Sequence, residues 1–184
     1  MKKNLLVTIS VIAFFVITFS ESCKPPRFTD AVSYNDSIID RIDMNTDVLS
    51  NLDDDMINDD GSHVMSAMQA AKDTLTKTLN YIKGMGAFKD YDDFRKAAET
   101  FVQNDLNRIT TGYSDLAQMI VKYGADFPDE EVDGFNDKLK KLDDASIDDM
   151  NVFNKAQDLF ADKFDFSVMH MPDLDSASGD GGSH

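Results

Sequence analysis

The side chains with the greatest capacity for chemistry in this sequence are carboxylates. There are 34 acidic residues, 30 of them Asp, against three His and one Cys. Carboxylates that share a helical bundle with His can hold a di-iron centre, but such a centre requires Glu-x-x-His pairs on facing helices. The sequence has no such pair, and His63, His170 and His184 lie at a helix start and in the C-terminal tail. We therefore expect no di-iron site.

The acidic run at 53–60 suggests calcium, which prefers oxygen ligands. If Gly61 is taken as the sixth residue of an EF-hand loop, Asn58 and Asp60 fall correctly at the third and fifth positions. The first and twelfth positions are then Met56 and Ala67, which have no oxygen in their side chains. The EF-hand is excluded, and weak divalent binding stays as an alternative to a solvated loop.

A second acidic cluster lies at 143–149, where Asp144 and Asp148 are four residues apart. Like charges at that spacing on a helix are mildly destabilising. We expect a solvated face, with Lys140 or Lys141 as the nearest positive charge.

The triplet Met169-His170-Met171 has the soft ligands that copper favours. It has no second cluster beside it, so we expect an inert tail. The sequence contains neither a Gly-x-Ser-x-Gly elbow nor a glycine-rich phosphate loop. We expect no catalytic residue, no bound metal or cofactor, and no enzymatic activity. The net charge of −16 disfavours nucleic acid as a partner.

The single cysteine, Cys23, follows a segment typical of export. Met1-Lys2-Lys3 precedes an apolar run from Leu5 to Phe19, and the small residues Ser20 and Ser22 lie just before Cys23. The apolar run is shorter than the roughly 20 residues that a membrane-spanning helix needs. This arrangement resembles the lipobox of bacterial lipoproteins, although Glu21 departs from the usual pattern. The resemblance implies that Cys23 becomes an acylated N-terminus; cleavage without acylation is the alternative.

Four apolar stripes at helical spacing follow, and no segment alternates as a strand would. They predict helices over 30–56, 64–82 and 94–123, with Asp90 as a cap for the third, and a fourth from Pro128 that kinks or breaks near 143–149. The fold class is all-α, an antiparallel up-down bundle of about four helices. Asn35 and Asn45 occupy two positions of the first stripe and are expected to set helix register. Gly112 is expected to mark a bend or a close helix contact.

The predicted organisation is a signal peptide at 1–22, a lipidated cysteine and tether at 23–29, a helical bundle at 30–168 and a disordered acidic tail at 169–184. This layout, with Tyr34-Asn35-Asp36-Ser37-Ile38-Ile39 in the first helix, is similar to uncharacterised helical surface lipoproteins of diderm bacteria. That resemblance implies an outer-membrane, lipid-anchored location in the cell envelope, with the periplasmic or surface face left open.

The leading hypothesis for function is a non-enzymatic envelope lipoprotein that serves as a protein-interaction or structural module. Its partners would be the membrane, through the lipid anchor, and a protein. The alternative is a binder of a small lipophilic ligand or a divalent cation. A lipophilic pocket could be lined by Phe153, Phe160, Phe164 and Phe166, although ordinary core packing explains these residues more simply.

Overall fold

A computed structural model of the chain describes residues 28–58 and 63–168. They form helices throughout, and within these ranges the only β-type pairing is an isolated bridge between Phe88 and Tyr91. The helices are α1 (Ala31–Asn58), α2 (Val64–Met85), α3 (Asp93–Arg108), α4 (Ser114–Tyr123) and α5 (Asp129–Phe164). A π-helical turn, Ile109–Tyr113, joins α3 to α4, and a short 3-10 turn, Gly124–Asp126, follows α4.

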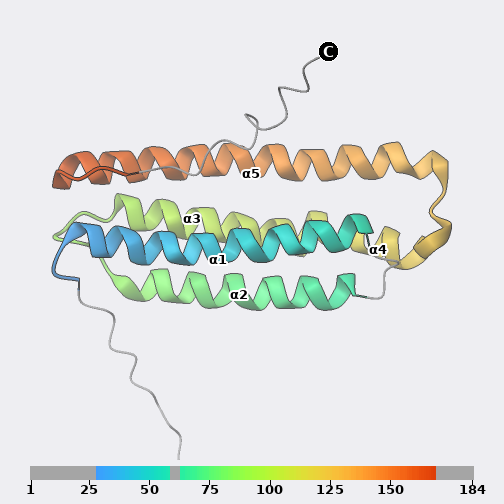
Figure 1. Ribbon diagram of the computed structural model, residues 1–184, viewed down its shortest axis with the longest axis horizontal. Helices are drawn as coiled ribbons and strands as arrows, with labels where there is room; N and C mark the ends of the chain where they lie inside the picture. Colours follow the sequence, from blue (N-terminus) through green and yellow to red (C-terminus); the bar gives the residue numbers. More distant parts are fainter. Residues whose placement is uncertain (1–27, 59–62, 169–184) are drawn as a thin grey trace, which may run out of the picture.

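The helices make four parallel and antiparallel rods, because α3, the π-turn and α4 run on as one (Figure 1). Successive rods run in opposite directions, so α1 and α3 are parallel to each other. In Figure 1, α5 lies along the top and α2 along the bottom, with α1 and α3 between them. The predicted all-α, up-down bundle of four helices is confirmed.

The predicted apolar stripes form the core. Residues that the sequence placed on them and that are buried include Ile38, Ile42, Leu52, Val64, Ala71, Leu75, Ile82, Phe94, Ala98, Val102, Ile109, Leu116, Phe153 and Phe160. Two stripe residues on α5 were placed wrongly: Leu159 is 53% exposed and Val132 is 40% exposed. Gln157 is buried in place of Leu159, because the spacing Phe153–Gln157–Phe160 keeps one helical face inward.

Helix α5 is continuous for 36 residues, so the break expected near 143–149 does not occur. The side chains of Asp143, Asp144 and Asp148 are exposed, which means that most of the acidic run lies on a solvated face. The apolar residues of the two halves of α5 lie on different sides of the helix because the two halves have different neighbours. The first half contacts α4, and the second half packs on α3 and α1.

The connection between α2 and α3 also differs from expectation. Asp90 does not cap the third helix: it has a positive φ of 64°, next to Lys89 with a φ of 45°. Both residues lie in a tight turn closed by reciprocal backbone hydrogen bonds between Phe88 and Tyr91, at 3.1 and 2.9 Å. The helix begins at Asp93 after Asp92, whose carboxylate binds Arg95 and makes no capping hydrogen bond.

Gly112 lies inside the π-helical turn and marks a close contact with α5. A Cβ atom at this position would overlap the side chain of Leu142. The prediction of a close helix contact at Gly112 is therefore confirmed, and the π-turn widens the third rod at the same level.

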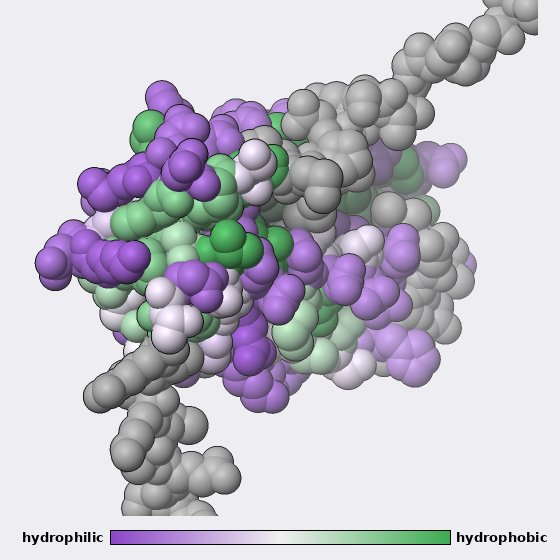
Figure 2. Space-filling view, turned by 60° about the vertical axis from the view of Figure 1, so that its left-hand side comes forward, coloured by the Kyte–Doolittle hydropathy of each residue, from purple (hydrophilic) through white to green (hydrophobic). Residues whose placement is uncertain are grey.

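The two ends of the bundle differ. Figure 2 looks toward the end where α1 begins, and hydrophobic side chains gather there among charged ones. The connection from α4 to α5 lies at the opposite end (Figure 1). None of the helices in the described ranges is both long enough and apolar enough to cross a membrane.

Candidate functional site

Several residues of the predicted sites lie outside the described ranges. These are Cys23 with the segment before it, the acidic residues Asp59 and Asp60, and the tail that contains His170 and His184. Asp53, Asp54 and Asp55 belong to the last turns of α1 rather than to a loop. Within residues 28–58 and 63–168, no three His, Cys, Asp or Glu side chains come together as metal ligands.

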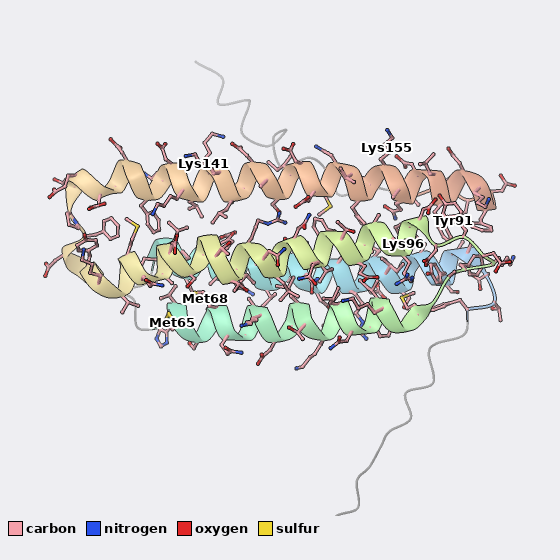
Figure 3. The ribbon with its side chains drawn as sticks, turned by 180° about the vertical axis from the view of Figure 1, so that it is seen from behind. Met65, Met68, Tyr91, Lys96, Lys141 and Lys155 are labelled. Atoms are coloured by element: carbon pink, nitrogen blue, oxygen red, sulfur yellow. The ribbon has the colours of Figure 1, made fainter. Side chains whose placement is uncertain are left out.

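The acidic cluster at 143–149 divides among several partners. Lys140 Nζ binds Asp144 Oδ1 at 2.8 Å on the exposed face of α5, as the sequence suggested. Lys141 points outward from α5, away from the other rods (Figure 3). Asp149 instead faces α3, where it accepts hydrogen bonds from Arg108 and, at 2.8 Å, from Asn104 Nδ2.

Arg108 joins two carboxylates inside the bundle. It forms ion pairs with Asp105 on its own helix and with Asp149 on α5. Asp105 is 1% exposed, and burial raises the pKa of its carboxyl to about 6 although Arg108 acts in the opposite direction. Burial lowers the pKa of Arg108, but the two carboxylates outweigh that effect and raise it overall. The sequence analysis missed this network, because it depends on how α3 and α5 face each other.

A half-buried carboxylate, Asp53, lies near the end of α1. Tyr113 in the π-turn donates a 2.7 Å hydrogen bond to Asp53 Oδ1. Burial raises the pKa of Asp53 to about 6, and the nearby charge of Asp143 adds to the rise. The pKa of Tyr113 is raised as well, by burial and by the Asp53 carboxylate. The hydroxyl therefore stays protonated and serves as a hydrogen-bond donor that joins the third rod to α1.

The two stripe asparagines of α1 behave differently. Asn35 Oδ1 accepts a 2.8 Å hydrogen bond from Gln157 Nε2 of α5, as expected for a residue that sets helix register. Asn45 is fully buried, and neither its Oδ1 nor its Nδ2 has a hydrogen-bond partner within the described part of the chain. Asp105 Oδ2 also lacks one. Asn45 lies eight residues before Asp53 on α1, and Asp105 lies eight residues before Tyr113 on the parallel third rod. Because Asp53 and Tyr113 are hydrogen-bonded to each other, Asn45 and Asp105 lie at a similar level of the bundle.

The aromatic residues proposed as a pocket are packed together. Phe153 and Phe160 are buried and stack against Phe94, with ring centroids 5.6 and 5.1 Å away. Phe164 and Phe166 contact Phe160 at 4.9 and 5.8 Å. These rings fill the core at the end where α1 begins, which favours core packing over a ligand pocket.

Open space instead lies between α4 and the beginning of α5, at the opposite end. One hollow of about 260 Å³ is lined mainly by apolar side chains: Met56, Ile120, Phe127, Val132 and Phe135. A second, of about 380 Å³, is more polar and is lined by residues that include Asp115, Lys122, Tyr123, Glu131 and Lys138. Between 129 and 149 of α5 only Phe135 is fully buried. This part of α5 therefore packs loosely on α4, and the seam between them is the candidate functional site.

The chemistry of this seam is that of recognition. Its apolar hollow presents aromatic and aliphatic side chains, and Val132 at its edge is 40% exposed. The two carboxyl groups whose pKa is raised to about 6, those of Asp53 and Asp105, line neither hollow. Comparison of the chain with protein-family models, with curated proteins and with solved structures finds no match.

Proposed function

We propose that this chain is a non-enzymatic lipoprotein of the bacterial cell envelope, acylated at Cys23 and anchored in the outer membrane, whose bundle acts as a protein-interaction or structural module. The basic start, short apolar run and lone cysteine of the sequence support the anchor. The observation that carries the interaction role is the open seam between α4 and α5 at the end of the bundle opposite to Phe28.

The seam suits a protein partner because its apolar surface is incompletely covered. Val132 on α5 is 40% exposed and lines the hollow together with Phe127 and Phe135. Clusters of this kind, an apolar centre with a charged rim, are where partner side chains gain most from burial. Asp115, Lys122, Glu131 and Lys138 supply charged groups of both signs beside it.

A structural role for the interior polar groups supports the non-enzymatic assignment. Asp53 and Asp105 have the raised pKa values that often mark catalytic acids. Each, however, bonds to a side chain within the bundle, Tyr113 and Arg108, and so links neighbouring turns or rods. Their chemistry serves helix register.

The anchor is tested by mass spectrometry of the full-length protein made in a bacterium with an outer membrane. We expect an N-terminal Cys23 that carries acyl chains, and a Cys23→Ser variant that leaves the membrane fraction. A chain that begins elsewhere, or one with residues 1–22 intact, contradicts the anchor.

The interaction surface is tested by cross-linking in intact cells with two matched variants of α5. Val132→Asp places a charge at the apolar hollow, whereas Val152→Asp changes a more exposed valine on another part of the same helix (65% against 40%). We expect Val132→Asp to abolish the cross-linked species and Val152→Asp to retain it. Equal effects of the two substitutions would argue against the seam as the binding surface.

A second candidate function rests on the same apolar hollow. At about 260 Å³ it is close to the smallest size typical of ligand sites. A small lipophilic ligand would copurify with the protein and would be lost from a Val132→Asp variant. Organic extraction of the purified protein followed by mass spectrometry distinguishes this role from binding of a protein.

A further inference from the structure

Seven aromatic rings gather at the end of the bundle where α1 begins, and we call them the aromatic end: Phe28, Tyr34, Phe88, Tyr91, Phe160, Phe164 and Phe166. Neighbouring rings are in contact, with Phe28 5.1 Å from Tyr34 and Phe88 5.0 Å from Phe164. The hydroxyl of Tyr34 donates a 2.7 Å hydrogen bond to the carbonyl of Gly86. The rings are therefore held in place by the start of α1, the α2–α3 turn and the end of α5.

This cluster is only partly covered by the rest of the protein. Tyr34, Phe88 and Phe160 are buried, but Phe28, Tyr91, Phe164 and Phe166 are half-buried. Val32, in the first turn of α1, is 46% exposed. The same apolar surface is visible in the view toward this end (Figure 2).

Two lysines lie against rings of the aromatic end. Lys89 Nζ is 5.1 Å from the ring centroid of Phe88 and 5.9 Å from that of Phe164. Lys163 Nζ is 5.1 Å from the ring centroid of Tyr91. Aromatic rings with lysines whose stems lie on apolar surface are typical of proteins at the boundary between lipid and water.

Chain length fixes how far this end lies from Cys23. Five residue steps separate Cys23 from Phe28, and even a fully extended chain covers only about 18 Å in that distance. If Cys23 carries the lipid, the aromatic end is the part of the bundle nearest to the bilayer. The seam between α4 and α5 is the farthest part.

We propose that the aromatic end docks on the surface of a zwitterionic bilayer, with Phe28, Phe164 and Phe166 in the headgroup region, so that the bundle stands upright on the membrane. The inference rests on the acylation of Cys23 proposed above. Exposed Asp30, Asp90 and Asp165 lie beside the rings, which disfavours a surface rich in anionic lipid. Because α5 alone is about 54 Å long at 1.5 Å per residue, docking holds the seam far from the lipid.

The absence of tryptophan from the chain makes a direct test possible. A single tryptophan is introduced at the aromatic end by Phe166→Trp, and a matched one near the seam by Phe127→Trp, since both phenylalanines are half-buried. Each full-length, acylated protein is incorporated into phosphatidylcholine vesicles that contain acyl chains brominated at known depths. We expect the Phe166→Trp fluorescence to be quenched several-fold more than that of Phe127→Trp, most strongly by bromines nearest the headgroups.

A longer tether separates docking from simple proximity. Ten Gly and Ser residues inserted after Lys24 leave the aromatic end unchanged, but the tether then no longer forces it to lie close to the bilayer. Docking predicts that the quenching of Phe166→Trp persists, and its loss overturns the proposal. Val168→Trp, also half-buried at this end, replaces Phe166→Trp if that variant does not fold.

Vesicle flotation distinguishes failure of the inference from failure of the proposed function. Protein that floats with the vesicles but shows equal, weak quenching at both tryptophans is anchored without docking, which refutes the inference alone. Protein that carries no acyl chain and does not float refutes the anchor, and with it the docking that depends on it.

Discussion

Gln157 of α5 donates a 2.8 Å hydrogen bond to Asn35 of α1, and the bond joins residues 122 positions apart in the bundle interior. Both side chains are nearly inaccessible to solvent. Because a lone amide in the core has no water to replace its partner, the pair restricts which turns of α1 and α5 can lie side by side.

Removing both members of this pair should cost less than the sum of the costs of removing each one alone. Gln157→Leu leaves Asn35 Oδ1 buried without a donor, which we expect to lower the free energy of unfolding by about 1–3 kcal/mol. The double substitution Asn35→Leu with Gln157→Leu should cost clearly less than the sum of the two single changes. Urea denaturation of the four proteins measures this coupling. Simple additivity would mean that the hydrogen bond contributes nothing specific.

The ion-pair network at Arg108 gives a larger effect. Arg108→Met leaves the Asp105 carboxylate buried beside Asp149 without its cation, and we expect a loss of about 3–5 kcal/mol at neutral pH. The loss should shrink at mildly acidic pH, where Asp105 becomes neutral. Adding Asp105→Asn should restore part of the stability at neutral pH. A loss that is the same at pH 5 and pH 7.5 would contradict this account.

The buried Asp105 and the half-buried Asp53 also predict how stability depends on pH. Burial raises the pKa of Asp53 and of Asp105 to about 6 in the folded protein, from 3.8. Between these values the folded state binds more protons than the unfolded state, so stability is highest near pH 4 and falls as the pH rises through about 6. A shift of this size corresponds to about 3 kcal/mol for Asp105 and less for Asp53, which solvent partly screens.

Neutral substitutions identify the groups that cause this dependence. Asp105→Asn should flatten the profile of melting temperature against pH between 4 and 7, and Asp53→Asn should do so to a smaller degree. Asp144→Asn on the exposed face of α5 is the control and should leave its shape unchanged. If stability instead rises over this range in the parent protein, the two carboxylates do not dominate it.

Two glycines in helical segments should respond oppositely to alanine. Gly134→Ala on α5 meets no atom within 4 Å and should stabilise the fold by about 0.5–1 kcal/mol through helix propensity. Gly112→Ala in the π-turn overlaps Leu142, so repacking should cancel that gain and destabilise the protein by about 1 kcal/mol. Thermal unfolding compares the two, and Leu142→Ala should remove the difference by opening space.

The success of the sequence analysis on the fold has a simple physical basis. Helical periodicity acts over a few residues, so the spacing Val64–Ala71–Leu75–Ile82 and its counterparts identify the inward faces without knowledge of their neighbours. The error on α5 is of the same local kind. Leu159 was chosen over Gln157 for its apolar character, although the four- and three-residue steps from Phe153 to Phe160 pass through Gln157.

The polar interior was less accessible from sequence, because it depends on pairs of residues that are distant along the chain. Asn35 and Asn45 were recognisable as polar positions on an apolar stripe, but nothing local identifies Gln157 as the partner of Asn35. Asp149 was visible only as one acid in a cluster, and its partner Arg108 lies 41 residues earlier. The seam between α4 and α5 was likewise not predicted, since it arises where the first half of α5 meets a short helix rather than a full core.

The turn at Lys89 and Asp90 is where the stability of the fold and the proposed membrane docking make opposite demands. Two successive residues with positive φ favour Asn-Gly, and the penalty for other residues is real. Asn-Gly would relax this backbone but would remove the ammonium group that lies over Phe88 and Phe164. A search for thermostable variants would therefore converge on this turn. If the aromatic end docks on lipid as proposed, the most stable protein from that search would be the one that docks least well.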